Sequence, residues 1–342
     1  MMKPTRPIVI AHRGASGYRP EHTLASYWLA IQQGADFIEP DLVSTREGVL
    51  VARHENEISQ TTDVSERPEF ARRRTTKQID GQPVTGFFTE DFSLAELQRL
   101  RAKERLPDLR PANCWYDRAF RIPTLDQVIA LAKLGSRVLR RSIGIYPETK
   151  HPSYFASLGL ALEEPLVRAL HRAGYKGRSA PVFIQSFEIA NLQALRHLTQ
   201  LPLIQLLDAD APPFDLTLVR DKRRARELIS NEGLRDIARY ADGIGVNKTL
   251  IVPQDPSGRS LPPTNLIERA HAANLRVHAW TFRRENAFLP LEHRKKPIDR
   301  PAAIGDLIGE LRDYLALGLD GMFSDQPDLA FAARRLASRI PR

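Results

Sequence analysis

The chain has 342 residues, of which 42% are hydrophobic and 27% are charged, and its formal net charge is +9. This composition is typical of a globular protein with a large core, and an α/β barrel of this length commonly forms a single domain. No apolar run reaches eighteen residues, which excludes a membrane-spanning helix. The single cysteine, Cys114, excludes an internal disulfide and a cysteine metal cluster.

The basic residues are spread along the chain, with local clusters at Arg72–Arg74, Arg220–Arg226 and Arg283–Lys296. No cluster interleaves aromatic residues in a recognition pattern, so we interpret them as solvated surface and expect no nucleic acid partner. A basic field also attracts anionic substrates. The first residues lead directly into an apolar strand without a signal-peptide pattern. We therefore expect a cytoplasmic protein, or a periplasmic one if an export signal has been removed.

The amino-terminal residues predict two barrel strands and a hairpin. Ile8–His12 is β-branched and ends in a glycine turn, and residues 23–34 carry apolar side chains at helical spacing. Phe37–Val43 is the second predicted strand. A turn at residues 46–48 then leads to the extended run Val49–Arg53. A parallel crossover needs a dozen or more residues, so we expect this run to form an antiparallel hairpin with the second strand.

Residues 44–121, called the insert below, contain this hairpin followed by a polar stretch with little periodicity. The one clear helical pattern there is Leu94–Lys103, with Ser93 and Glu96 in capping-box spacing. Long stretches of this kind are usually functional. We therefore expect an inserted cap subdomain within one domain that spans residues 1–342.

Regular alternation of strands and helices resumes at Pro123. The expected strands are Ile143–Lys150, Val182–Phe187, Leu203–Leu207, Gly243–Asn247, Arg276–Phe282 and Gly321–Ser324. The expected helices are Leu125–Leu134, Ser157–Arg172, Ile189–His197, Leu234–Tyr240, Asn265–Ala273, Ile304–Leu317 and Asp328–Ser338. With the first two strands this gives eight, which predicts a TIM (β/α)8 barrel with a cap inserted after its second strand.

Functional residues of such barrels lie at the carboxyl ends of the strands. Glu39 and Asp41 are two residues apart in one predicted strand, so both side chains point into the barrel, and Glu148 and Lys150 repeat this spacing. Three carboxylates without cysteines or a histidine-rich cluster favour one hard divalent cation, Mg²⁺ or Ca²⁺. A structural salt-bridge network of the same carboxylates with Arg13 and Lys150 is the alternative. The other polar strand ends are His12, Gln185, Asn247, Trp280 and Asp325.

Two histidines, His12 and His54, end apolar runs. One such histidine is as often structural as catalytic, but two histidines beside carboxylates and basic residues suit acid–base phosphoryl-transfer chemistry on a metal. We expect Phe187 and Trp280 to shape the wall of a pocket. Lys248 is expected to be a solvated surface lysine.

Six ordered motifs resemble those of the glycerophosphodiester phosphodiesterase family, most closely its bacterial periplasmic type. They are IAHRGASGYRPEHT, FIEPDLV, IGIYPETK, IQSF, YADGIG and GMFSDQP, and they extend from Ile10 to Pro327. The resemblance implies hydrolysis of glycerophosphodiesters, such as glycerophosphocholine or glycerophosphoethanolamine, to sn-glycerol 3-phosphate and an alcohol. It also implies a small-molecule substrate rather than stable insertion into a membrane.

The resemblance also implies a role for each matching residue. His12 and His54 would be the general acid and base, and Glu21 of the PEHT motif would support the metal site. The metal carboxylates would be Glu39, Asp41 and Glu148, and the phosphate-binding cations would be Arg13 and Lys150. From their positions at strand ends we also expect Gln185, Phe187 and Trp280 to contact substrate. Two positions depart from the family pattern: Glu55 stands where the family usually has Asp, and Pro40 removes one ladder hydrogen bond.

Two alternatives remain at this stage. A related barrel phospholipase, of the lysophospholipase D or sphingomyelinase D kind, would need an apolar rim that faces the membrane, and the arginine-rich stretch Arg67–Lys77 does not resemble one. A non-catalytic barrel that binds a phosphorylated ligand would not need both histidines and all three carboxylates. The choice between water and a glycerol hydroxyl as nucleophile, the alcohol group and the oligomeric state are open.

Overall fold

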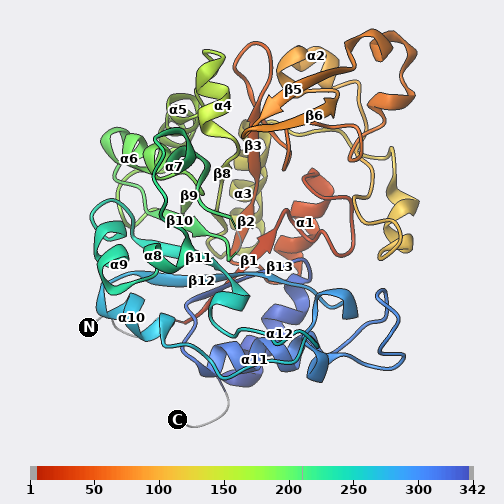
Figure 1. Cartoon of the computed structure of the whole chain (residues 1–342). Coiled ribbons are helices and arrows are strands. Elements are labelled where there is room, and N and C mark those ends of the chain that lie inside the picture. Colours follow the sequence, from red (N-terminus) through yellow and green to blue (C-terminus); the bar gives the residue numbers. More distant parts are fainter. Residues whose placement is uncertain (1–5, 210, 339–342) are drawn as a thin grey trace.

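A computed structural model describes residues 6–209 and 211–338 of the chain, and its main feature is a closed barrel of parallel strands (Figure 1). Each barrel strand pairs in parallel with the next, and the last pairs with the first, so the sheet closes. The eight strand positions are β1 (Ile8–His12), β2 (Phe37–Glu39) continued by β3 (Asp41–Ser44), β7 (Gly144–Ile145) continued by β8 (Glu148–Thr149), β9 (Ile184–Ser186), β10 (Leu203–Leu207), β11 (Gly243–Asn247), β12 (Arg276–Phe282) and β13 (Gly321–Ser324). The predicted TIM barrel is confirmed.

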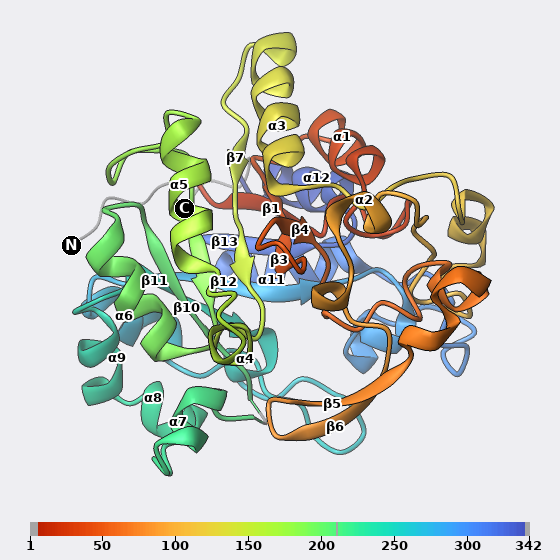
Figure 2. The same cartoon turned by 90° about the horizontal axis from the view of Figure 1, so that it is seen from above.

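Helices surround the barrel, as the view from above shows (Figure 2). The outer helices are α1 (Leu24–Gln32), α3 (Leu125–Leu139), α5 (Glu163–Arg172), α6 (Ile189–Leu198), α9 (Asn231–Ile237), α10 (Leu266–Ala272), α11 (Leu307–Ala316) and α12 (Pro327–Ala337). The short helices are α2 (Leu94–Leu97), α4 (Pro152–Ser157), α7 (Phe214–Leu218) and α8 (Ala225–Leu228). The hydroxyl of Thr23 caps α1 and Thr124 with Gln127 forms a capping box on α3, which fixes where these helices begin.

Two predicted strands are each divided in the structure. The second strand is interrupted at Pro40 and the third at Tyr146 and Pro147. A proline has no N–H to donate to the ladder, so regular pairing stops there and resumes after it. Both interruptions lie on the same side of the barrel, because β2 pairs with β7 and β3 pairs with β8.

Three helix predictions were wrong in extent. The helix expected at residues 157–172 begins only at Glu163, as α5, because Ser157 is the last residue of the separate helix α4 and Gly159 between them has a φ of +72° that does not continue a helix. The pattern at residues 94–103 yields only the four-residue α2, although the capping box of Ser93 and Glu96 is present. In the other direction, α3 continues to Leu139, beyond the expected end at Leu134.

The insert begins with the predicted hairpin, since β4 (Leu50–Ala52) pairs antiparallel with β3. It also contains a second hairpin that was not predicted, β5 (Thr75–Ile79) with β6 (Gln82–Gly86), which lies at the periphery in both views (Figures 1 and 2). Most residues of this hairpin are exposed, so its sequence lacks the apolar alternation of a half-buried strand.

The 3-10 helices are η1 (Val64–Glu66), η2 (Pro68–Arg73), η3 (Thr89–Asp91), η4 (Pro111–Tyr116), η5 (Lys248–Leu250), η6 (Asn286–Phe288) and η7 (Leu291–His293).

Two apolar clusters support this arrangement. A small cluster inside the barrel contains Ile10, Phe37, Tyr146, Phe183, Ile204 and Phe323. The large cluster lies between barrel and helices and continues into the insert, where Phe70, Phe87 and Phe92 belong to it. The insert therefore shares its apolar core with the barrel. Within the described residues, no helix is both long and apolar enough to cross a membrane.

This shared core predicts that Phe92→Ala destabilises the whole chain. Phe92 is fully buried and lies edge-to-face with Phe70 at 5.1 Å, so its removal leaves a cavity. The free energy of unfolding should fall by about 3–5 kcal/mol. Trp115→Ala, which changes an 89% exposed aromatic residue of the same insert, should alter it by less than about 0.5 kcal/mol. Urea unfolding followed by circular dichroism tests this, and a separate insert transition would contradict the shared core.

Candidate active site

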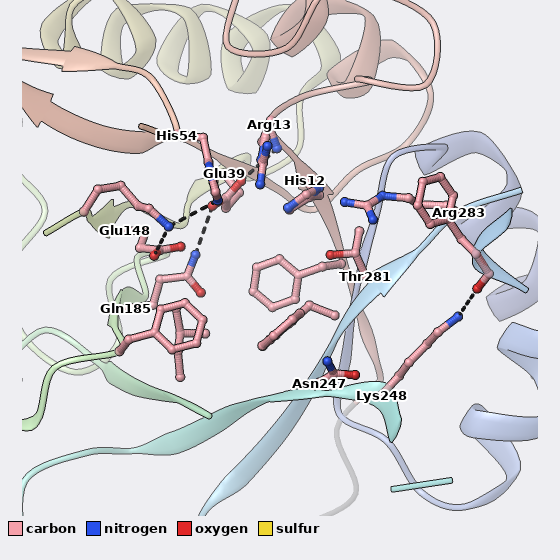
Figure 3. A pocket seen from close by; sticks show the side chains of 16 residues that line it. His12, Arg13, Glu39, His54, Glu148, Gln185, Asn247, Lys248, Thr281 and Arg283 are labelled. Carbon is pink, nitrogen blue, oxygen red and sulfur yellow. Dashed lines mark hydrogen bonds and ion pairs between the residues drawn. The ribbon is translucent and has the colours of Figure 1, made fainter. Parts of the chain in front are cut away.

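A pocket of about 280 Å³ opens at the carboxyl ends of the barrel strands (Figure 3). Of the residues given a catalytic, metal or substrate role in the sequence analysis, those that line it are His12, Arg13, Glu39, His54, Glu148, Lys150, Gln185, Phe187 and Trp280. Asp41 lies beneath the lining, and Glu21 lies behind Arg13. Strands distant in the chain thus bring these residues to one place. Lining residues without a role predicted from sequence include Asn247, Thr281, Arg283 and Phe288.

The three predicted metal carboxylates form one buried cluster. Glu39, Asp41 and Glu148 each place an oxygen within 4.8 Å of the other two, and Asp41 and Glu148 are direct partners of β3 and β8. Glu39 accepts from the Arg13 backbone N–H at 2.8 Å and from the Gln185 amide at 3.0 Å. Asp41 Oδ1 is buried and has no hydrogen-bond partner among the described residues. An all-oxygen set with an unpartnered oxygen fits a hard divalent cation.

The charges in this cluster shift the pKa values of its members apart. Burial, together with the neighbouring Asp41 and Glu148, raises the pKa of Glu39 well above its usual range. Burial and then Asp41 raise the pKa of Glu148 to about 8, against the opposing effect of Lys150. Burial also acts to raise the pKa of Asp41, but Lys150 and a hydrogen bond from His22 keep it well below its usual range. A divalent cation would relieve the repulsion that these shifts report.

His12 ends β1 and is held by a carboxylate. Its Nδ1 donates to Asp325 Oδ1 at 2.6 Å, just beyond the end of β13. This contact fixes the ring and leaves Nε2 for the pocket. Burial, and next the positive charge of Arg13, lower the pKa of His12 to about 4. A pKa in this range keeps the ring neutral at pH 7.

His54 follows β4 and has a matching arrangement. Its Nδ1 donates to the carboxylate of Glu55, and its Nε2 lies 3.2 Å from Lys150 Nζ. Glu55 therefore contacts the histidine directly, although the family usually has Asp at this position. Burial, followed by Arg13 and Lys150, lowers the pKa of His54 to about 3. This second ring is also neutral at pH 7.

Two cations lie beside the carboxylate cluster. Arg13 sits in a left-handed conformation (φ +59°) that aims its backbone N–H at Glu39, while its guanidinium contacts Glu21 at 3.0 Å and Asp41 at 3.3 Å. Lys150 Nζ donates to Glu148 at 2.8 Å. Glu21 contacts Arg13 and Arg105 and does not belong to the carboxylate cluster. It can support the site only through these arginines.

The opposite wall of the pocket is largely apolar. Phe187 and Trp280 pack edge-to-face at 5.9 Å, and Phe288 also lines the pocket. The amide nitrogen of Gln185 is engaged by Glu39, but its Oε1 is buried without a partner among the described residues. The pocket thus has a charged side and an aromatic side.

The structure corrects the expectation for Lys248. This lysine is buried, not solvated, and its Nζ donates to Glu310 and to the Phe288 carbonyl. The sequence predicts an exposed lysine here because nothing near Lys248 in the chain indicates an ion-pair partner. Its partner Glu310, on α11, is 62 residues away. Arg105 and Arg110 of the insert are close to the site and were also missed, because the segment around them has no periodic pattern.

Comparison with known proteins gives the family. A family model described as the glycerophosphoryl diester phosphodiesterase family matches residues 12–329. A glycerophosphodiester phosphodiesterase of Arabidopsis thaliana is 36% identical, over all of this chain and 89% of that protein. The chain belongs to this family. The resemblance of the sequence motifs is therefore confirmed, and the protein is an enzyme, a phosphoric diester hydrolase.

Other relatives agree with this membership. A glycerophosphodiester phosphodiesterase of Haemophilus influenzae is 28% identical over 94% of this chain and 88% of that protein. A solved structure from Silicibacter pomeroyi has a TM-score of 0.68 at 18% identity and covers 98% of this chain and 95% of its own. A phosphodiesterase of Oleispira antarctica, solved in complex with the product sn-glycerol-3-phosphate, has a TM-score of 0.57 at 20% identity, with 96% of each chain covered. These two structures support the barrel fold.

The buried pair of Lys248 and Glu310 predicts a pH-dependent stability change. Burial raises the pKa of Glu310, and Lys248 opposes this shift. Lys248→Met should lower the free energy of unfolding by about 3–5 kcal/mol at pH 7, because an unpaired carboxylate stays buried. The loss should be smaller at pH 5, since a raised folded-state pKa means that the penalty grows as pH rises.

Lys248→Met/Glu310→Gln is the matched control and should recover most of that stability. Urea unfolding at both pH values measures all three proteins. A Lys248→Met variant as stable as the wild type at pH 7 would contradict the structural role of the pair.

Proposed function

We propose that this enzyme hydrolyses glycerophosphodiesters such as glycerophosphocholine and glycerophosphoethanolamine to sn-glycerol 3-phosphate and an alcohol, using a divalent cation and two histidines. The observation that carries the proposal is the pocket itself. It combines two carboxylate-held histidines, three clustered carboxylates and two cations at the carboxyl ends of one barrel. The product bound to the Oleispira antarctica phosphodiesterase is the one this reaction would release.

Glu39, Asp41 and Glu148 would hold the cation, Mg²⁺ or Ca²⁺. When bound, the cation would supply Lewis-acid polarisation of a phosphate oxygen and would neutralise part of the negative charge. The chain itself supplies two further positive charges. Arg13 contacts Asp41 and Lys150 contacts Glu148, so both cations would bind the phosphate oxygens and stabilise the charge that builds in the transition state.

The histidines would transfer the protons. Both rings are held at Nδ1 by a carboxylate, which directs Nε2 towards the pocket and fixes the tautomer. One neutral ring would accept a proton from the nucleophile, either water or the neighbouring glycerol hydroxyl. The other would protonate the leaving alkoxide, whose unassisted departure is slow. An anionic phosphodiester beside the rings favours the charged form of that second histidine.

The apolar wall would receive the carbon skeleton of the substrate. Phe187 and Trp280 line the pocket and pack edge-to-face with each other. The glycerol part is short and bears only small apolar surfaces, which suits a wall of this size. Gln185, which is tied to Glu39, would orient a cluster carboxylate in addition to contacting substrate.

Replacement of either histidine should remove activity. We expect His12→Ala and His54→Ala each to lower kcat by about 10²–10⁴-fold with glycerophosphocholine, because each removes one proton transfer. His197→Ala, at an exposed position on α6, is the control and should match the wild type. Glycerol 3-phosphate release in a coupled dehydrogenase assay measures this. Wild-type turnover in His12→Ala or in His54→Ala would contradict the two-histidine mechanism.

Removal of the cation should also abolish turnover. EDTA treatment should eliminate glycerol 3-phosphate release, and either Mg²⁺ or Ca²⁺ should restore it. Glu148→Gln should resist this restoration, because it loses one of three anionic ligands. Lysophosphatidylcholine is measured in parallel, and preference for it over glycerophosphocholine would favour the phospholipase alternative. Full activity in metal-free protein would exclude the cation.

A further inference from the structure

Both histidine–carboxylate pairs of the site are contacted by the same short segment of the insert. Residues 104–113, called the arginine loop here, carry Arg105 and Arg110, five positions apart. Each arginine contacts the carboxylate that holds one histidine. One short loop of the insert therefore touches both halves of the proton-transfer machinery.

Arg110 lies behind His12. Its Nη2 donates to Asp325 Oδ2 at 2.6 Å, while Asp325 Oδ1 accepts from His12. The Nε of Arg110 donates to Glu285 at 2.8 Å, and its Nη1 donates to the Ser16 carbonyl at 3.1 Å. The Arg110 side chain is only 5% exposed. Asp325 Oδ2 also accepts from Arg283 Nε at 2.8 Å, so both oxygens of the Asp325 carboxylate are engaged and its orientation toward His12 is restrained.

Arg105 lies behind His54. Its Nη1 and Nη2 donate to the two oxygens of Glu55 at 3.0 and 2.5 Å, a bidentate pair. The same Nη2 donates to Glu21 at 2.7 Å, and Glu21 accepts from Arg13 at 3.0 Å. Arg105 therefore links the carboxylate that holds His54, through Glu21, to Arg13, the cation proposed to bind the phosphate.

The arginine loop is itself braced. Asn113 donates to Glu104 at 2.9 Å and to the Ser16 carbonyl at 3.1 Å, which ties both ends of the loop together and to the turn after β1. The Glu104 N–H donates to Asp117 at 2.7 Å, and the Arg110 N–H donates to the Leu106 carbonyl at 2.8 Å. A loop with this many internal contacts holds its side chains in place before substrate arrives.

We propose that Arg105 and Arg110 are positioning residues for the two histidines, so that the insert supplies part of the catalytic support and not just a cover for the pocket. This inference rests on the proposed function. Each arginine acts through a carboxylate on histidine Nδ1, which sets the tautomer and aim of Nε2. Lysine cannot reproduce this, because an ammonium lacks the planar fork with which Arg105 binds both oxygens of Glu55 and Arg110 binds Glu285 and Asp325 together.

Double-variant cycles test whether each arginine acts through its carboxylate. Arg110→Ala and Asp325→Asn should each lower kcat by about 100-fold, and the double variant should be no slower than the slower single variant. The same should hold for Arg105→Ala and Glu55→Gln. Arg99→Ala, which breaks an exposed ion pair of the same insert, should keep wild-type kcat. Unchanged kcat in the arginine variants, or losses that multiply, would overturn the proposal.

A second substrate separates positioning from general structural damage. With a p-nitrophenyl ester of glycerol phosphate, the leaving group departs without a proton. The arginine variant that disturbs the histidine acting as general acid should therefore regain activity with this substrate. The variant that disturbs the general base should remain slow with both substrates. Equal losses on both substrates in both variants would overturn positioning.

Folding and the proposed function are controlled separately. Arg105→Lys and Arg110→Lys retain the charge, so they should fold as judged by circular dichroism and still show reduced kcat. His12→Ala and His54→Ala are run in the same assay. If the histidine variants are inactive and the arginine variants are normal, this inference alone fails, whereas active histidine variants would overturn the proposed function as well.

Discussion

The mutual repulsion of three buried carboxylates is the interaction on which the rest of the site depends. Glu39, Asp41 and Glu148 hold oxygens within 4.8 Å of one another at the ends of neighbouring strands. Burial of like charges costs several kcal/mol unless cations compensate it. Arg13 and Lys150 supply two positive charges against three carboxylates. The repulsion that raises the pKa of Glu39 and of Glu148, together with the unpartnered oxygen of Asp41, favours a divalent cation at this cluster.

The same cations set the behaviour of the histidines. Burial, with the positive charges of Arg13 and Lys150, keeps His54 neutral, and burial with Arg13 keeps His12 neutral. A neutral ring needs a partner on Nδ1 to fix its tautomer, and each ring has a carboxylate there. Those carboxylates in turn need cations, which arrive partly from the insert. The barrel and the insert thus form one connected charge network around the pocket.

The sequence predicted most of the barrel and the central residues, since both leave local signals. Strand and helix periodicities alternate along the chain, and Glu39 and Asp41 lie two positions apart on one edge. The features that it could not predict depend on contacts between residues far apart in the chain. Lys248 is buried only because Glu310 faces it from α11. The β5–β6 hairpin is exposed on most positions, so it has no apolar alternation to read.

A crystal of the enzyme soaked in Mn²⁺ would test the central claim most directly, because anomalous scattering locates the ion without reference to turnover. The account predicts one strong anomalous peak within coordination distance of Glu39, Asp41 and Glu148, in a pocket that still holds both histidines. A peak bound elsewhere, or none at this carboxylate cluster in a crystal that contains Mn²⁺, would contradict it.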